Sequence, residues 1–462
     1  MFTNKHEMDM TTGNLFKKII IFCVPLMLTG ILQMFYHTAD LIIVGRFSNQ
    51  ANAVGAVGST SALINLIVNL FMGLSVGTNV MVARYFSSQK HDNLEKCVHT
   101  SITISLVFGT ILGIVGFLFA RFFLSLMQNP IDLAVTYLKI YFIGMPFNML
   151  FNFAASVLRG IGDTKRPLIF LMIAGLINVF LNMFFVIVLG MSVDGVAYAT
   201  IISQFASCIM IIVCLLKTKE AYGFRFNKMQ INGHELIQIA KIGLPAGVQG
   251  SIFSISNVII QSTVNQFGAS VIDGTSIAQS IEGFVYISMN SVYNAALSFI
   301  GQNVGVQKYE NIKRITWRCL FVVTMIGVGM GGGLFLAKPL VTRLYTTDPN
   351  VIEVAFIRLH YLCLPYFLCG IMDVMVGCLR GLGTSFVPMV VSILGVCGFR
   401  ITWIYTIFYR FGNFTDYNSL HLLYVSYPIS WVVTFIVHVI CYEVIYHKLL
   451  NRHQAMELEL EE

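Results

Sequence analysis

The chain has 462 residues, of which 56% are hydrophobic and only 11% are charged, and it carries 29 Lys and Arg against 22 Asp and Glu. An ordinary soluble domain has about 25% charged residues, and a globule of this length needs a large polar surface. The composition therefore argues against a soluble enzyme, a nucleic-acid-binding domain, a disordered chain and a collagen. It predicts an all-α integral membrane protein with room for about twelve spanning helices.

Twelve apolar segments have the length of a membrane-spanning helix. We expect helices because hydrocarbon offers no partner to an unpaired backbone group, and because the segments lack the alternation of barrel strands. The segments cover residues 17–44, 53–80, 98–120, 132–157, 168–190 and 195–216, and then 241–267, 275–300, 317–337, 352–378, 388–409 and 420–446.

The segments predict four parts of the chain. These are an N-terminal lobe at 1–216, a cytoplasmic linker at 217–240, a C-terminal lobe at 241–446 and an acidic cytoplasmic tail at 447–462. We expect the last residues of the tail, Glu457–Glu462, to be disordered. The ten cysteines form no Cys-x-x-Cys pair and lie in or beside apolar runs, so we expect small apolar packing residues rather than disulfides.

Four polar groups lie at one predicted depth, near the outer ends of three spans of the first half. Asp40 is in the first span, Asn178 and Asn182 are four residues apart on one face of the fifth, and Thr200 is in the sixth. A charge at this depth costs at least ~2.5–3.5 kcal/mol. Oxygen ligands suit a hard cation such as sodium, and a lone carboxylate suits a proton. We therefore predict an ion-binding or coupling site here; the alternative is an Asp that reaches the outer interface beside interhelical amide bonds.

The ionisable residues of the second half follow another pattern, because Ile260 stands where the first half has Asp40. Glu353, Arg358 and Lys139 lie near outer ends of spans, where long side chains reach for the interface. Polar and charged side chains within the spans are candidates for a substrate cleft, with interhelical hydrogen bonds or buried ion pairs as the competing account. The candidates are Gln33, Tyr36, His37, Gln261, Glu282, Asn290, Asp373 and Arg400.

The two halves repeat each other at an offset of about 220 residues. Three matches lie in the same order: Pro25 with Pro245, Gln89-Lys90 with Gln307-Lys308, and Leu158-Arg-Gly-Ile-Gly162 with Leu379-Arg-Gly-Leu-Gly383. Six spans per half is an even number, so both halves have the same orientation and a pseudo-two-fold axis along the membrane normal. Parallel repeats of this kind bind substrate between the halves and work by rocking.

The glycine-rich stretches do not predict a nucleotide site. The Arg-Gly-x-Gly turns follow no strand, and the phosphate-loop pattern Gly-x-x-x-x-Gly-Lys-Ser/Thr is absent from the sequence. The run Gly327–Gly333 lies inside an apolar span, where close helix packing or a flexible hinge is expected. Without a nucleotide site, any pumping must draw on an ion gradient, and we expect no cofactor. A membrane enzyme or a channel is a further alternative, but no nucleophile and base set in the sequence supports an enzyme and no filter-like loop supports a channel.

The basic residues predict the orientation. With the N-terminus in the cytoplasm, 21 of the Lys and Arg fall in inner segments and three within spans. Five fall in outer segments, namely Arg46, Arg121, Lys338, Arg343 and Arg410. The positive-inside rule then places both termini in the cytoplasm.

These residues together resemble the multidrug and toxic compound extrusion (MATE) family, from about residue 15 to residue 446. The resemblance rests on six stretches: Pro25 with Asp40-Leu-Ile-Ile-Val-Gly45, Leu158-Arg-Gly-Ile-Gly-Asp-Thr-Lys-Arg-Pro167, Asn178-x-x-x-Asn182, Gly195-Val-Ala-Tyr-Ala-Thr200, Gly301-Gln-Asn-Val-Gly305 and Leu379-Arg-Gly-Leu-Gly383.

The resemblance implies a fold and an activity. It implies twelve helices in two six-helix lobes around a V-shaped cleft, in the cell membrane. It implies a secondary antiporter, working by alternating access, that exports organic, often cationic compounds in exchange for sodium ions or protons. The family's ion-binding residues map onto Asp40, Asn178, Asn182 and Thr200.

Two departures leave sodium and protons both open as the coupling ion. The prokaryotic branch closest in pattern has an acidic residue where this chain has Asn182, and the acidic residue that another branch carries early in the seventh span is replaced by Gln249 and Gly250. The alternative function is a flippase for a lipid-linked saccharide or another amphiphile of the same fold. The expected partners are small organic cations or amphiphiles and the lipid bilayer, without nucleic acid, and the expected state is a monomer.

The orientation can be tested by labelling single cysteines in a background that lacks the native ones. We expect Asn227→Cys to react with a membrane-impermeant reagent from the cytoplasmic side, because the linker carries many of the inner basic residues. The control is Arg410→Cys in an outer segment, which should react from outside. The reverse pattern would refute the predicted topology.

Overall fold

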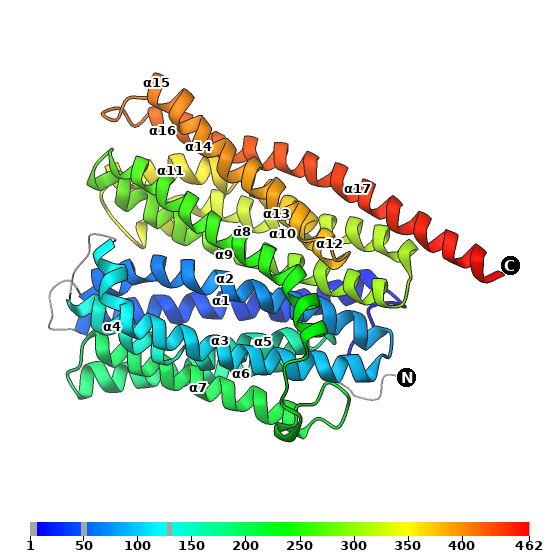
Figure 1. The fold of residues 1–462 in the computed structure, drawn as a ribbon. Coiled ribbons are helices and arrows are strands. Elements are labelled where there is room, and N and C mark those ends of the chain that lie inside the picture. Colours follow the sequence, from blue (N-terminus) through cyan, green and yellow to red (C-terminus); the bar gives the residue numbers. More distant parts are fainter. Residues whose placement is uncertain (1–6, 48–52, 127–131, 462) are drawn as a thin grey trace. The chain divides into compact units, whose positions relative to one another are not determined.

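The computed structural model describes residues 7–47, 53–126 and 132–461, and this part of the chain consists of helices and connecting turns (Figure 1). The helices of the first half are α1 (Leu15–Phe47), α2 (Ala53–Ser87), α3 (His91–Leu126), α4 (Asp132–Ile143), α5 (Met145–Gly160), α6 (Lys165–Met183), the π-helical η1 (Phe184–Val188) and α7 (Val193–Lys217).

A 3-10 turn, η2 (Phe226–Lys228), precedes the second half. That half contains α8 (Gly233–Asn265), α9 (Ala269–Gly305), α10 (Tyr309–Arg343), α11 (Pro349–Leu362), α12 (Tyr366–Gly381), α13 (Phe386–Ser392), η3 (Ile393–Gly398), α14 (Phe399–Trp403), η4 (Ile404–Phe408), α15 (Tyr409–Phe411), α16 (Ser419–Tyr424) and α17 (Ser426–Glu461).

The described helices account for the predicted spans. Nine of them are long and apolar enough to cross a membrane, and two bent pairs, α4 with α5 and α11 with α12, bring the number to eleven. The remaining predicted span, 275–300, lies within α9, a 37-residue helix. Within the described residues the all-α membrane fold predicted from composition is confirmed.

The chain divides into two compact units. The first contains Met1–Asp9 and Leu28–Ser251, and the second contains Met10–Met27 and Ile252–Glu462. The first part of α1 therefore packs with the second unit, and the first part of α8 packs with the first unit. The first helix of each half thus begins in the other half's unit. The expected lobe boundaries at residues 216 and 241 did not include this exchange of helix segments.

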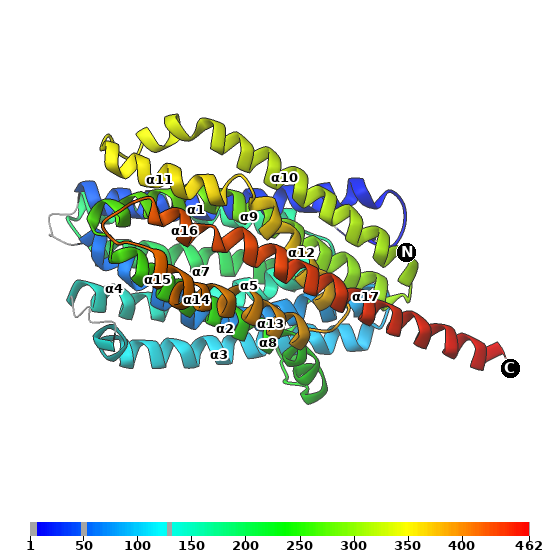
Figure 2. The same ribbon diagram turned by 90° about the horizontal axis from the view of Figure 1, so that it is seen from above.

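Each unit is a bundle of long helices. In the first unit α5 packs against α2, α3 and α7, and α6 packs against α7. In the second unit α12 packs against α9, α10 and α17, and Figure 2 shows the long α17 running beside α12 and α13. The cysteines of these bundles are free and buried or half-buried, as expected for packing residues.

The duplication is visible in the helix ends. Gln89 and Gln307 have positive φ angles of 54° and 58°, and Gly162 and Gly383 have φ angles of 95° and 91°. The amide that follows each of these residues donates back to a carbonyl five residues earlier, as in a Schellman motif: for example Lys90 to Tyr85 and Lys308 to Asn303. The repeated sequence pairs therefore build the same turn in both halves.

The duplication also extends to the helix breaks, which the apolar pattern did not predict. The predicted spans 132–157 and 352–378 are each broken into two helices, with bends of 49° and 47°. Pro146 and Pro365 lie at these breaks, where each removes a backbone donor. The π-helical turns η1 and η4 lie 220 residues apart, in the fifth span of each half.

Glycines join α8 to the first unit. A Cβ atom at Gly73 of α2 would lie 2.1 Å from the Gly247 nitrogen, and one at Gly247 would lie 2.0 Å from the Leu70 carbonyl oxygen. Gly77 and Gly243 make equivalent close approaches to backbone of the facing helix. Two glycine pairs spaced by four residues thus bring the two backbones into direct contact.

The glycine run of α10 also serves packing. A Cβ atom at Gly327 would lie 2.7 Å from the Phe367 Cα atom, and one at Gly331 would lie 2.4 Å from the Cys363 carbonyl oxygen. Both glycines face the break between α11 and α12, whereas Gly329, Gly332 and Gly333 face open space. The expectation of close helix packing in this run is confirmed.

The segments predicted as a linker and a tail have defined structure within the described residues. The Arg225 and Asn232 amides donate to His99 Nε2 and Thr100 Oγ1 of α3, each at 3.0 Å. The expected disorder at Glu457–Glu462 is wrong for most of that segment, since α17 continues to Glu461. Met, Leu and Glu are strong helix formers, so the acidic end extends the helix that precedes it.

The glycine contact between α2 and α8 predicts a stability effect. We expect Gly247→Ala to destabilise the folded protein by about 1–3 kcal/mol, because the new methyl group meets rigid backbone. The measurement is the thermal unfolding midpoint in detergent. The matched control is Gly329→Ala, where a Cβ atom meets nothing within 4 Å. Equal midpoints for the two variants would contradict the backbone contact.

Candidate functional site

A cavity of about 480 Å³ opens within the first unit. Its walls come from α1, α2, α4, α5, α6 and α7, and they combine hydroxyl, amide and aromatic side chains with one carboxylate. The lining residues are Gln33, Tyr36, His37, Asp40, Ile64, Tyr137, Tyr141, Asn148, Phe151, Asn152, Leu171, Ala174, Gly175, Asn178, Thr200, Ser203, Gln204 and Ser207.

Helical periodicity brings these side chains together. On α1 the lining positions Gln33, Tyr36, His37 and Asp40 follow the spacing of one helix face. On α7, the four lining residues from Thr200 to Ser207 follow the same spacing. In a membrane bundle such a stripe is ordinarily apolar or small, so polar stripes that converge on one cavity indicate a binding site.

Asp40 is buried, with 7% of its surface exposed. Asn182 Nδ2 donates to Asp40 Oδ1 at 2.5 Å and to Asn178 Oδ1 at 3.1 Å. The two asparagines are buried as well, and the structure therefore brings together Asp40, Asn178 and Asn182 as the sequence predicts.

The remaining members of the predicted site lie close to this triad in the same cavity. Thr200 lines the cavity, and its hydroxyl donates to the Val196 carbonyl oxygen at 2.9 Å, which leaves the hydroxyl oxygen available as a ligand. His37 also lines the cavity, but among the described side chains it makes no hydrogen bond to Asp40. Its ring is one turn of helix from the carboxylate.

One acceptor of the site has no partner among the described residues. Asn182 Oδ1 is buried and accepts no hydrogen bond there, although the amide nitrogen of the same side chain makes two. A buried polar atom without a partner costs about 1–3 kcal/mol. With the Asn182 amide rotated so that its oxygen faces Asp40, a cation or a proton there would meet this oxygen, the Asp40 carboxylate and the Asn178 amide oxygen, a set of hard oxygen ligands. The residues present therefore fit a sodium ion as well as a proton.

The cavity depends on a glycine of α6. A Cβ atom at Gly175 would overlap the ring of Tyr36, at 1.8 Å from its Cζ atom. The Tyr36 hydroxyl donates to the Met172 carbonyl oxygen at 3.4 Å on the same helix. Gly175 thus gives the Tyr36 ring its place against α6, one helical turn from Asp40.

The second unit confirms that the carboxylate site is not duplicated. Ile260, the position equivalent to Asp40, is a buried apolar residue with 3% of its surface exposed. Sequence alone left Glu282 as either a cavity-lining group or part of an ion pair. It accepts from Arg358 Nη2 at 2.6 Å, and both side chains are buried.

The place of Arg358 corrects one expectation. Long cations near the end of a span were expected to reach for the interface, but Arg358 has only 4% of its surface exposed. Its guanidinium lies between Glu282 and the rings of Tyr424 and Tyr427. Arg358 stays buried rather than reaching the interface because the Glu282 carboxylate on the facing helix α9 neutralises its charge inside the unit.

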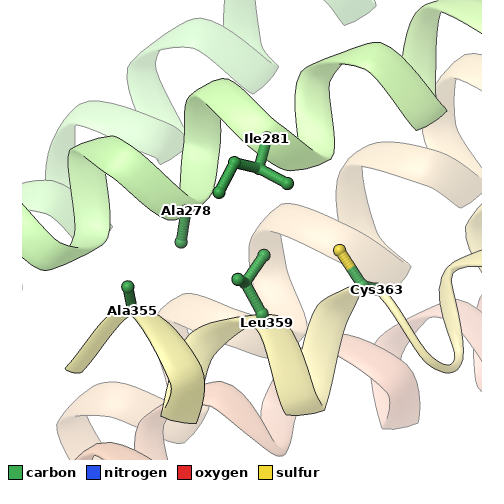
Figure 3. Close-up of a cluster of buried hydrophobic side chains, with 5 residues drawn as sticks. All are labelled: Ala278, Ile281, Ala355, Leu359 and Cys363. Carbon is green, nitrogen blue, oxygen red and sulfur yellow. The ribbon is translucent and has the colours of Figure 1, made fainter. Parts of the chain in front are cut away.

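An apolar cluster flanks this ion pair and packs α9 against α11 (Figure 3). In Figure 3 the α9 residues Ala278 and Ile281 point toward α11, and Leu359 of α11 points toward α9. The cluster consists of Ala278, Ile281, Ala355, Leu359 and Cys363. Glu282 and Arg358 immediately neighbour Ile281 and Leu359 in the chain, and both charged side chains are buried, with 7% and 4% of their surface exposed.

Arg400 and Asp373 are placed differently. Arg400 is buried; its Nε donates to Ser430 Oγ at 3.0 Å and its guanidinium lies 3.9 Å from the centre of the Tyr427 ring. Asp373 is half-buried in α12, and its electrostatic neighbours are Arg380 and Arg400. These charges form a network inside the second unit.

The other candidates in the second unit make amide hydrogen bonds. Gln261 donates to Asn265 Oδ1 at 3.0 Å and accepts from Gln279 at 3.3 Å, and Asn290 accepts from Asn294 Nδ2. Interhelical hydrogen bonds were the competing account for such residues; the bond between Gln279 and Gln261 is of this kind, whereas the other two lie within one helix. The substrate cleft predicted from all eight candidates stays a prediction.

Some lining residues had no place in the predicted site. Tyr137, Tyr141, Asn148, Asn152, Ser203 and Ser207 line the cavity beside Asp40. The signal that could have found several of them is periodic: Asn148 and Asn152 repeat the spacing of Asn178 and Asn182, and Ser203 and Ser207 extend the stripe that begins at Thr200. Tyr137 and Tyr141 are also four residues apart, but in the sequence they resemble ordinary interior aromatics.

Comparison with known proteins identifies the family. The profile of the MatE family matches the chain over residues 25–184 and 245–406, more than half of its length. The chain belongs to the MATE family. The two matched segments begin at Pro25 and Pro245, the first pair of the internal repeat, so the family pattern is itself present twice in this MATE protein.

Individual relatives agree with this assignment. The chain is 25% identical over 451 residues to YoeA of Bacillus subtilis, a probable multidrug resistance protein, with 94% of this chain and 95% of the relative covered. It is 24% identical over 395 residues to the probable multidrug resistance protein NorM of Thermotoga maritima, with 83% and 84% covered.

A solved structure shares the fold. It is the outward-facing conformation of a multidrug resistance MATE family transporter, with a TM-score of 0.89 and 21% identity, covering 98% of this chain and 100% of that one. The fold, the family and the multi-pass membrane character of this transporter are therefore established together.

The ion pair between α9 and α11 predicts an asymmetric mutational effect. We expect Arg358→Met to destabilise the protein by about 3–5 kcal/mol, because it leaves the Glu282 charge buried without a partner. The double variant Glu282→Gln with Arg358→Met should recover most of this loss. Thermal unfolding of both in detergent measures the difference, and a double variant no more stable than the single one would contradict the pairing.

Proposed function

We propose that this MATE protein is a secondary active antiporter that exports organic cations in exchange for sodium ions or protons, with Asp40 as the coupling residue. The observation that carries the proposal is a buried carboxylate in a 480 Å³ cavity that is hydrogen-bonded by an amide and, among the described residues, is not paired with a cation. A buried carboxylate without a positively charged partner attracts a cation that enters the cavity.

The charge of the cavity supports a cationic cargo. Among the described residues its lining includes one carboxylate, no Lys or Arg, and the aromatic rings of Tyr36, Tyr137, Tyr141 and Phe151. A carboxylate and aromatic faces are the groups that attract an organic cation in a partly desolvated site. The same lining argues against the alternative, a flippase for a lipid-linked saccharide, since the phosphate of such a lipid would seek Arg or Lys.

The coupling chemistry follows from one formal negative charge. With Asn182 in place of a second carboxylate, one sodium ion or one proton neutralises the site. In the carboxylate form the Asn182 amide presents its nitrogen to Asp40 and leaves its oxygen without a partner. Binding of either ion favours rotation of this amide, because the oxygen then serves as a ligand to sodium or as an acceptor for the Asp40 proton.

Export requires that this event be linked to the cargo. An ion that neutralises Asp40 lowers the affinity of the cavity for a cationic compound. By reciprocity, the bound compound lowers the affinity of the cavity for the ion by the same factor. Alternating access of two duplicated halves supplies the conformational change. In the orientation that the basic residues predict, both termini are cytoplasmic and the exported compound leaves on the outer side of the plasma membrane.

The decisive variant is Asp40→Asn, which removes the charge and nearly keeps the shape. We expect it to abolish export driven by an imposed gradient, measured with a panel of cationic dyes in vesicles that carry a proton or a sodium gradient. The matched control is Asp132→Asn at the exposed start of α4, whose carboxylate pairs with Arg121 at the surface. Export by Asp40→Asn at the rate of the control would refute the coupling role.

A second variant tests whether Asn182 shares the site. Asn182→Asp places two carboxylates on one cavity, and like charges in contact titrate together. We expect the pH dependence of export to change, and the stoichiometry of the driving ion to rise where both carboxylates are neutralised. An unchanged pH profile in a folded Asn182→Asp protein would separate Asn182 from the coupling event.

A further inference from the structure

A second cavity, of about 780 Å³, lies in the second unit and takes no part in the proposed transport site. It opens between the C-terminal end of α10 and the N-terminal half of α11, with α16 at one side. Its lining residues are Lys338, Pro339, Arg343, Thr347, Pro349, Ile352, Glu353, Phe356, Ile357, His360 and His421. These helix ends lie on the side of the spans that the basic residues predict to be external.

The charge on this cavity is positive. Lys338 and Arg343 line it against the single carboxylate of Glu353, and neither cation forms an ion pair with another described residue. The Lys338 ammonium lies 4.2 Å from the centre of the Phe335 ring and 4.9 Å from that of Phe356. Aromatic faces hold the ammonium group at the cavity wall while leaving its N–H donors available for an anion.

An apolar stripe continues from the cavity along α10. Leu336, Leu340 and Leu344 repeat at intervals of four residues and are 81%, 70% and 79% exposed. In a membrane-spanning helix such residues face the acyl chains of lipids. The cavity therefore joins a cationic end to a hydrocarbon-facing surface. This arrangement is complementary to an amphiphile with an anionic head group and an apolar tail.

The helix α11, which forms one wall of the cavity, is held in place by its contact with α9. The face of α11 that carries Ala355 and Leu359 packs against α9 (Figure 3), and the ion pair of Arg358 with Glu282 locks the same contact. Ile352, Phe356 and His360 lie on the adjoining face of α11 and line the cavity. The site is thus preformed on a rigid helix, so little ordering is required for binding.

We propose that this cavity binds the phosphate-bearing head group of an anionic phospholipid. Lys338 and Arg343 would hold the phosphate, and the acyl chains would lie along Leu336, Leu340 and Leu344. Pro349 begins α11 at the cavity wall, and the start of that helix is capped by Asp348, whose carboxylate accepts from the Asn350 amide at 2.9 Å. A free inorganic anion would use the two cations but would gain nothing from the leucine stripe.

The test measures lipid binding by the purified full-length protein. The probe is a fluorescently labelled phosphatidylglycerol in mixed micelles, read by anisotropy and displaced by unlabelled phosphatidylglycerol, phosphatidylcholine or inorganic phosphate. We expect Lys338→Gln and Arg343→Gln each to weaken binding about fivefold, since a basic residue near a lipid surface contributes about 1 kcal/mol. Glu353→Gln should strengthen binding, because it removes the one carboxylate among the described lining residues.

The matched control is Arg410→Gln, which removes a cation outside this cavity in the same unit and should leave binding unchanged. The unfolding midpoint of each variant in detergent alone establishes that it is folded. Equal displacement by phosphatidylcholine and phosphatidylglycerol would overturn the proposal, as would wild-type affinity in the two cation variants. Displacement by inorganic phosphate as effective as that by the lipid would assign the cavity to a free anion instead.

Discussion

The need to compensate charge and backbone polarity inside hydrocarbon governs this protein. It makes every span a helix, and it decides which charged side chains can be structural. The Glu282–Arg358 pair meets the need internally, since each group neutralises the other within the second unit. Asp40 does not, because an amide rather than a cation is its hydrogen-bond partner among the described residues. One half of a duplicated chain therefore carries a buried carboxylate that no cation among the described residues neutralises.

The duplication explains why the halves can share a backbone and differ in chemistry. The Schellman ends at Gln89 and Gln307 and the proline breaks at Pro146 and Pro365 recur because turns and helix breaks are encoded locally. The side chains that face the interior have diverged, as Asp40 and Ile260 illustrate. A π-helical turn begins directly beyond Asn182 in α6, and its counterpart η4 persists in the second half without the asparagines.

Small residues set the architecture that surrounds these charges. Gly73 and Gly247 allow two helix backbones to touch, which ties the first part of α8 to the first unit. Gly175 has a different effect, since the space it leaves is filled by the ring of Tyr36 at the wall of the ion cavity. Because hydrocarbon supplies no hydrophobic drive between helices, such close contacts carry much of the packing energy.

The sequence by itself determined the spans, the duplication, the family resemblance and the cluster of Asp40, Asn178 and Asn182, because hydrophobic length, repeated turn residues and helical spacing are local properties. Tertiary structure decided the rest. Arg358 is buried rather than interfacial because Glu282 faces it from another helix, and Tyr137 and Tyr141 line the cavity because α4 bends away from α5 at Gly144. Partners distant in the chain leave no periodic trace, so only the packed helices reveal which charges are compensated and which await an ion.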